Sequence, residues 1–232
     1  MKKIIATISC CLMIILAFAQ HKTINDPNAQ VRHVKSFHAI KVSSGIHLYL
    51  SQGNEEAVAV SASDAEYRNR IITEVDDGVL KIYYENKSWL WNNDNDKRHL
   101  KAYVSCKTLD ALKASSGAYV DVDGAITSGN LNLEFSSGSN FRGTVNVSDL
   151  KIEQGSGAEA VITGTATATH VEASSGSSLK AKDLETDHCD ARVSSGGTVD
   201  IKVKKELFAS AHSGGQINYS GAGVIKEIST GS

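Results

Sequence analysis

Ser136-Ser137-Gly138 is one of five copies of the tripeptide Ser-Ser-Gly, and weaker copies end at three further glycines. The last glycines of the eight copies are Gly45, Gly117, Gly138, Gly157, Gly176, Gly196, Gly214 and Gly231. After a first gap of 72 residues, successive glycines are 21, 19, 19, 20, 18 and 17 residues apart. A nearly constant period of this length is typical of stacked repeat architectures.

Each copy of the tripeptide lies between two stretches in which apolar and polar residues alternate. The positions three and five residues before and after the motif glycine are nearly all apolar, as at Leu133, Phe135 and Phe141. The position four residues before the glycine is never apolar; it holds Lys41, Lys113, Glu134, Glu153, Glu172, Arg192, Ser210 and Glu227. Strict alternation predicts half-buried β-strands rather than helices.

The repeat therefore reads as strand, Ser-Ser-Gly turn, strand and second turn. A meander of hairpins is the first alternative, but it would require neither equal repeats nor identical turns. Repeats of about 19 residues with one constant corner fit the coils of a β-solenoid, each lying on the last at about 4.8 Å. The eight glycines would supply the positive φ that a tight corner needs. The serine hydroxyls would form a column, bonded to one another or to neighbouring backbone.

Residues 1–19 have the pattern of a secretory signal peptide. Lys2 and Lys3 precede an apolar run that ends at Ala17-Phe18-Ala19, a small-x-small cleavage site. A lipoprotein signal using Cys10 or Cys11 and a retained anchor are the alternatives. We expect an exported protein in the periplasm, on the outer surface or outside the cell, with no membrane span after cleavage. Residues 20–35, which contain the only proline, are expected to form a flexible leader.

The charge of the mature chain excludes one class of partner. The whole chain carries 24 Lys and Arg against 26 Asp and Glu, and the signal removes two lysines, which leaves 22 − 26 = −4. Without a basic stripe we expect no nucleic-acid partner. Cys106 and Cys189 remain after cleavage, and two buried thiols are favoured over a disulfide because both adjoin apolar strand positions.

The stretch 36–232 is expected to form one solenoid domain in which residues 54–105 are an irregular β insertion and 109–232 are regular coils. The insertion is expected to contain a hairpin, with a turn at Asp77-Gly78 between strands of Ile71–Tyr84. It could cover the N-terminal end of the stack, where such arrays need a cap. The last turn leaves an uncovered C-terminal edge, which suggests self-association through that coil.

The residues also resemble a known family. The opening Phe-x-x-Ile-x-Val-Ser-Ser-Gly-Ile-x-Leu-x-Leu-x-Gln-Gly at 37–53, followed by repeated Ser-Ser-Gly coils, is similar to "putative auto-transporter adhesin, head GIN domain" proteins of Bacteroidetes. The Gly-Ile-Asn of the family name is replaced by Gly45-Ile46-His47. The resemblance implies an all-β, right-handed parallel β-helix of the periplasm or cell surface, and it supplies no catalytic residues.

Two groups of residues are candidate binding sites. Glu134, Glu153 and Glu172 share one offset, so they would form an outward column about 5 Å apart that could bind a cation such as calcium or a sugar. A solvated ladder, neutralised by Lys113, Lys151 and Arg192, is the alternative. The second group comprises Trp89, Trp91 and Tyr83, a platform for sugar rings or else a cover for the solenoid end.

Asp94-Asn95-Asp96 has calcium-ligand chemistry but lacks the central Gly and the closing Glu of a calcium loop. The sequence thus predicts no metal site, no required cofactor and no catalytic residue. We expect an adhesin-like or scaffolding protein of the cell envelope that binds polysaccharide or protein through its solenoid faces. A carbohydrate-active enzyme on the same fold and a periplasmic regulatory module that binds a partner are the alternatives.

Overall fold

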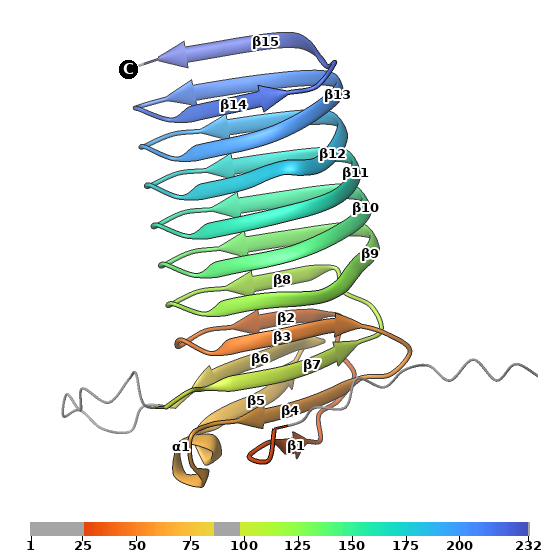
Figure 1. Cartoon of the computed structure of the whole chain (residues 1–232), viewed down its shortest axis with the longest axis vertical. Coiled ribbons are helices and arrows are strands. Elements are labelled where there is room, and N and C mark those ends of the chain that lie inside the picture. The colour runs from red at the N-terminus through yellow and green to blue at the C-terminus, as the bar shows by residue number, and fades with distance from the viewer. Residues whose placement is uncertain (1–25, 86–97, 232) are drawn as a thin grey trace, which may run out of the picture.

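The computed structural model describes residues 26–85 and 98–231 and is a β-solenoid (Figure 1). The predicted signal peptide, Trp89, Trp91 and Asp94–Asp96 lie outside these residues. The regular part consists of five long parallel strands, and all but one of the pairings between neighbours contain register shifts near the middle of the strands. The five strands are β9 Tyr119–Phe135, β10 Asn140–Gln154, β11 Glu159–Ala173, β12 Ser178–Val193 and β13 Thr198–His212. The predicted solenoid with a coil of about 19 residues is confirmed.

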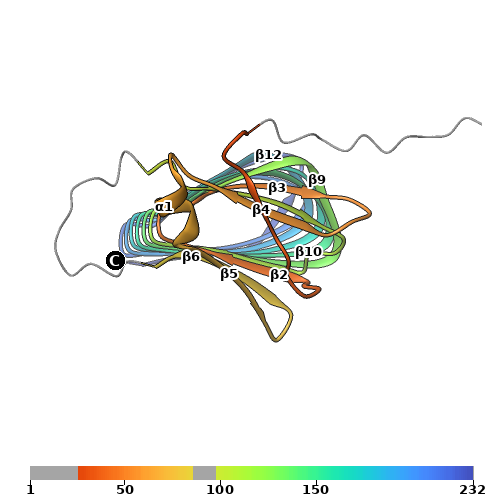
Figure 2. The same ribbon diagram turned by 90° about the horizontal axis from the view of Figure 1, so that it is seen from below.

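Each long strand bends once and so contributes to both broad faces of the flattened coil, which Figure 2 shows from one end. We call face A the side formed by the first halves of β9–β13, which leave a Ser-Ser-Gly corner. Face B is the side formed by their second halves, which lead into the next corner. β14 Gln216–Ser220 extends face A beyond β13, and β15 Val224–Gly231 extends face B.

The Ser-Ser-Gly corners are tight turns in which two consecutive residues have positive φ. At one of them φ is 51° for Ser137 and 69° for Gly138, and Ser139 N–H donates to Ser136 C=O at 3.1 Å. This is the pattern of a type I′ turn, which requires positive φ at both central residues. Gly138 N–H also donates to Ser156 C=O of the next coil at 3.0 Å.

The pair of positive φ values recurs at seven corners, whose glycines are Gly45, Gly117, Gly138, Gly157, Gly176, Gly196 and Gly214. Six of these glycines donate their N–H to the corner serine of the next coil. The corners are therefore joined mainly through the backbone rather than through the predicted column of hydroxyls. Buried serines just after the glycine add side-chain bonds, as Ser139 Oγ donates to Ala114 C=O at 2.9 Å.

The eighth copy differs from the prediction. Gly231 belongs to β15 and pairs with His212, so it is not at a corner. The repeat count predicts an offset of 17 residues between β13 and β15, but the pairing has an offset of 18 at Leu207 and Ile225, and the extra residue Lys226 at a bulge raises it to 19 from Phe208 and Glu227 onward. As a result Glu227 lies beside Phe208, and Ser229 takes the place beside Ser210.

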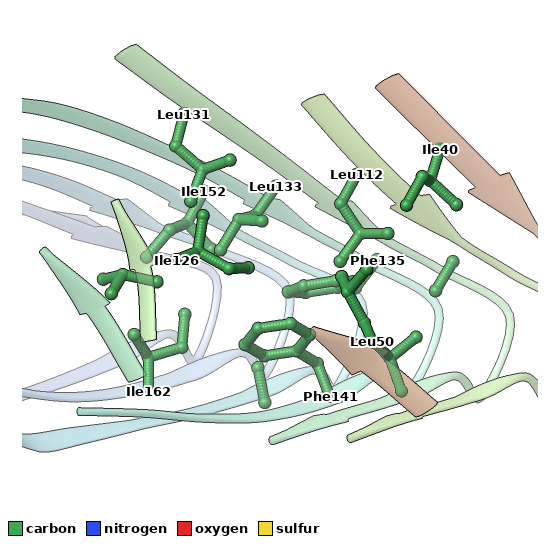
Figure 3. Packing of buried hydrophobic residues seen from close by; sticks show 14 of the residues in the cluster. Ile40, Leu50, Leu112, Ile126, Leu131, Leu133, Phe135, Phe141, Ile152 and Ile162 are labelled. Carbon is green, nitrogen blue, oxygen red and sulfur yellow. The ribbon is translucent and has the colours of Figure 1, made fainter. Parts of the chain in front are cut away.

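Apolar side chains from both faces fill the solenoid (Figure 3). Leu133, Ile152 and Leu179 are fully buried, as the alternation predicts. Phe135 and Phe141 stack at a centroid distance of 4.9 Å. Gly143 leaves room for this stack, because a Cβ there would lie 2.8 Å from the Phe141 ring.

Gln154 is a polar exception at an inward position, between Phe135 and Ala173 on the neighbouring coils. It is 4% exposed, and neither side-chain amide atom has a hydrogen-bond partner among the described residues. A buried amide without partners keeps its desolvation cost uncompensated.

We therefore expect Gln154→Met to raise the free energy of unfolding by about 1 kcal/mol, because methionine has a similar volume and no polar group to satisfy. Gln52→Met is the matched control, and we expect it to lower the free energy of unfolding. Gln52 donates to the carbonyls of Lys107 and Thr127 and accepts from Thr127 N–H at 2.7 Å. Urea unfolding of both variants checks the pair, and a loss of stability at Gln154 would show that its amide is satisfied after all.

The N-terminal coils are stacked out of sequence order. β2 Ala39–Val42 and β3 His47–Gln52 form the first Ser-Ser-Gly unit. β6 Val79–Tyr84 pairs with β2, and β7 Lys101–Cys106 pairs with β3, both parallel. β8 Ala111–Ala114 pairs with the other edge of β2. The insertion thus adds strands to the stack on one side of β2 and β3, and the chain then returns to the other side (Figure 1).

Antiparallel elements of the insertion close the N-terminal end. β4 Ala57–Ser61 pairs with β7, and β5 Ile71–Asp76 pairs with β6 as the predicted hairpin. α1 Ala65–Asn69 is capped by the Asp64 side chain. β1 Gln30–Arg32 pairs with β4, so part of the predicted flexible leader is built into the fold. The alternation of apolar and polar residues could not predict this strand, because β1 contributes backbone hydrogen bonds while Val31 is 66% exposed.

The C-terminal end has no such cover among the described residues. Tyr219 and Ile228 pair with the buried or half-buried Ile201 and Ala209, yet they are 48% and 60% exposed. Self-association through this coil stays a prediction. Cys106 and Cys189 are buried and free, and burial raises their pKa values to about 11 and about 12.

Candidate functional site

The predicted glutamate column lies on face B in a shallow groove of about 620 Å³ beside the Ser-Ser-Gly corners. Parallel register places Glu134, Glu153 and Glu172 side by side on β9, β10 and β11, followed by Arg192 on β12. The groove crosses these strands and reaches β13. The residues that line it include Glu134, Ser136, Glu153, Glu172, Ser174, Arg192 and His212.

Each glutamate of the column has a cationic neighbour. Lys113 binds Glu134, and Lys151 binds Glu153. Arg192 lies 3.7 Å from Glu172 and 2.7 Å from Asp190. The hydrogen bond to Glu153 raises the pKa of Lys151. The groove thus presents alternating charges that neutralise one another, together with serine hydroxyls.

This arrangement does not resemble a metal centre. No group of three or more His, Cys, Asp and Glu side chains within residues 26–85 and 98–231 is arranged to hold a metal ion. The interleaved cations also oppose the cation binding considered for the column, since a divalent ion would have to displace them.

Of the three residues in the predicted aromatic group, the structure describes only Tyr83. Tyr83 lies on β6, and its hydroxyl donates to Glu74 Oε1 at 3.3 Å. Burial is the first of the effects that raise the pKa of Tyr83, and the neighbouring Glu74 carboxylate adds to it. Tyr83 therefore lies near the N-terminal end on the face B side, whereas Trp89 and Trp91 lie outside the described residues.

A different aromatic cluster lies on face A, across β7, β3 and β9. His47 and Tyr49 stack at 4.2 Å between ring centroids, and Tyr49 stacks on Tyr103 at 5.2 Å. Tyr119 is beside His47, with its ring tilted by 46° at 6.0 Å. Tyr119 is 52% exposed and Tyr49 is 37% exposed. We call these four residues the aromatic row.

Hydrogen bonds fix two members of the aromatic row, His47 and Tyr103. His47 Nε2 lies 2.6 Å from Asp121 Oδ2, and Tyr103 donates to Asp26 Oδ2 at 2.8 Å. Burial and this bond to Asp26 raise the pKa of Tyr103 well above its usual value. Desolvation opposes ionisation of Asp26, but hydrogen bonds from Tyr103 and Ser61 outweigh it and lower the Asp26 pKa.

Sequence reasoning missed the aromatic row. A partial signal was present, because His47 and Tyr119 share the outward position two residues after their motif glycines. Tyr103 carried no such signal, because its place beside Tyr49 follows from the out-of-order pairing of β7 with β3. Within the described residues no helix is long and apolar enough to span a membrane.

The comparisons with known proteins concern the solenoid as a whole. Residues 36–223 match the model of a family described as "Putative auto-transporter adhesin, head GIN domain". A search of curated proteins gave no match. The names of the family and of the similar structures are those of adhesins and a lipid-binding protein, and not of enzymes.

Several solved structures share the fold. A "putative lipid binding protein" from Parabacteroides distasonis has a TM-score of 0.69 at 16% identity, over 89% of this chain and 95% of that one. A "putative adhesin" from Parabacteroides merdae has 0.69 at 15%, over 88% and 93%. Another from Bacteroides fragilis has 0.66 at 17%, over 87% and 95%. Because the family model spans most of the sequence, this chain belongs to the "Putative auto-transporter adhesin, head GIN domain" family.

Proposed function

We propose that this chain is an exported, adhesin-like protein of the cell envelope that binds an extended polymer along its solenoid faces without covalent chemistry. The observation that carries the proposal is the groove on face B, which crosses consecutive coils and repeats similar polar positions on each of them. A polysaccharide or an extended polypeptide can meet such positions one after another, and parallel strands hold them about 4.8 Å apart.

The neutralised charges in the groove favour binding over catalysis. Glycoside hydrolysis needs two carboxylates with separate roles, one held protonated and one ionised. The groove glutamates instead lie beside Lys113, Lys151 and Arg192. The family and the similar structures, whose names are not those of enzymes, support the same choice.

The test uses fluorescently labelled protein and two preparations, purified surface polysaccharide and solubilised envelope protein. Glu153→Lys places a like charge beside Lys151 at the centre of the groove, so we expect binding to the true partner to weaken about tenfold or more. Lys180→Glu is the control with an equally large change of charge, because Lys180 is an exposed residue of β12 on face A and lies outside the groove.

Binding to one preparation with loss only in Glu153→Lys supports the proposal and identifies the polymer. If the two variants bind equally well, the groove is not the contact surface. Release of reducing sugar from the polysaccharide would instead favour a carbohydrate-active enzyme.

A further inference from the structure

We propose that Tyr119, Asp121 and Asn140 on face A form a binding site for a pyranose ring of a neutral hexose polymer. This inference rests on the proposed function, because it names a ligand class and a second contact surface for the same adhesin-like protein. It concerns the opposite face from the groove.

Tyr119 supplies the apolar surface that a sugar ring needs. Half of the side chain is exposed, and the aromatic partner beside it, His47, meets it at a tilt rather than face to face. A hexopyranose has a C–H face that carries partial positive charge, and the face of an aromatic ring carries partial negative charge. By contrast, Tyr49 is stacked between His47 and Tyr103, and Tyr119 is the most exposed tyrosine of the row.

Polar groups for the sugar hydroxyls lie next to this ring. Asp121 is two residues further along β9 and therefore points to the same side, and its side chain is 46% exposed. Asn140 is the register partner of Tyr119 on the next coil, and its amide donates to Gly138 C=O at 3.3 Å. Carboxylate and amide oxygens accept hydrogen bonds from hydroxyl groups, so Asp121 and Asn140 could hold two neighbouring hydroxyls.

His47 prepares the site without being its main contact. Its Nε2 lies 2.6 Å from Asp121 Oδ2, and its Nδ1 lies 3.4 Å from the Tyr49 hydroxyl. These contacts fix one carboxylate oxygen of Asp121 and leave the other for a ligand. Arg142 is the register partner of Asp121 on the next coil, and Glu159 is the register partner of Asn140. The site therefore has charges of both signs around it, which favour neither an acidic nor a basic sugar, and this is why the proposal names a neutral polymer.

The experiment is a calorimetric titration with cellohexaose, maltohexaose and mannohexaose. We expect the native chain to bind at least one of them and Tyr119→Ala to weaken that binding about tenfold or more. Tyr119→Phe should bind normally, because it keeps the ring. Tyr83→Ala is the matched control and also tests the aromatic group on the other side of the solenoid. Thermal unfolding of each variant excludes a folding defect.

Two results would overturn the inference. Unchanged binding in Tyr119→Ala, or loss in Tyr83→Ala instead, would place the sugar elsewhere. Failure of the native chain to bind any of the three oligosaccharides would remove the hexose site, and envelope binding through the groove would still be decided separately by Glu153→Lys.

Discussion

Replacement of Gly164 by alanine is expected to lower the free energy of unfolding by about 4 kcal/mol, the sum of a backbone and a packing cost. Gly164 has φ of 110°, in a region that residues with a Cβ rarely adopt. A Cβ at this position would lie 2.0 Å from the carbonyl oxygen of Val145 on the preceding coil. That oxygen belongs to backbone and cannot rotate away, so the two coils would have to separate.

Two control variants divide this cost into its parts. Gly124 has φ of 79°, and no atom lies within 4 Å of the place that a Cβ would take there, so Gly124→Ala should show the backbone cost alone, about 1–2 kcal/mol. Gly129 has neither a positive φ nor a neighbour within 4 Å, so Gly129→Ala should be nearly neutral. Chemical denaturation of the three variants gives the ranking. Equal stabilities for the Gly124 and Gly164 variants would mean that the coils can move apart at little cost.

The expected difference in stability between the Gly124 and Gly164 variants also shows which features of the fold could be predicted from the sequence. Gly124 and Gly164 each stand seven residues after a motif glycine, where a glycine is typical of the second turn of the repeat, and both have positive φ. Their difference in crowding arises from how closely neighbouring coils approach, and a turn motif does not encode that distance. The period and the alternation, in contrast, follow from local rules, because side chains of a strand must point alternately inward and outward.

Sequence reasoning was weakest where the stack departs from chain order. The period of the repeat predicts that each unit of the chain stacks on the unit before it. β6 and β7 instead lie on the side of β2 and β3 that is opposite to β8 and β9. Nothing in the alternation of residues 79–84 distinguishes a strand that pairs with β2 from one that pairs with another edge. The aromatic row depends on this pairing, and so it became visible only in three dimensions.

The two candidate sites differ in the same way, since the glutamate column could be predicted from the repeat and the aromatic row could not. The glutamate column was predictable, because Glu134, Glu153 and Glu172 share an offset in consecutive repeats and the register between their strands is unbroken there. Glu227, which has the same offset from its motif glycine, does not lie beside Ser210: Ser229 takes that place, two residues further on than the repeat count predicts, and the bulge at Lys226 accounts for one of the two. One inserted residue shifts the pairing of all that follow, and the repeat count alone cannot locate it.

The second large effect is expected for Phe135→Ala, which should lower the free energy of unfolding by about 4 kcal/mol. Phe135 is 1% exposed and stacks on Phe141 in the interior that Figure 3 shows. Its register neighbours on the two adjacent coils are Ala114 and Gln154. The space between these coils is filled by the Phe135 ring and not by the side chains of the two neighbours. Phe208→Ala is the matched control, because Phe208 is 43% exposed on face B, and we expect a change within about 0.5 kcal/mol.

The size of the Phe135 effect depends on whether the cavity can collapse. Continuous hydrogen bonds tie β9 to β8 and β10 on the two sides, so the backbone around the ring cannot close in without breaking the ladder. A cavity that persists gives the upper part of the usual range for a lost phenylalanine. Urea unfolding of both variants measures the difference. A cost for Phe135→Ala near that of Phe208→Ala would mean that the coils slide to fill the gap, and that the ladder of corners and strands is softer than its regular hydrogen bonding implies.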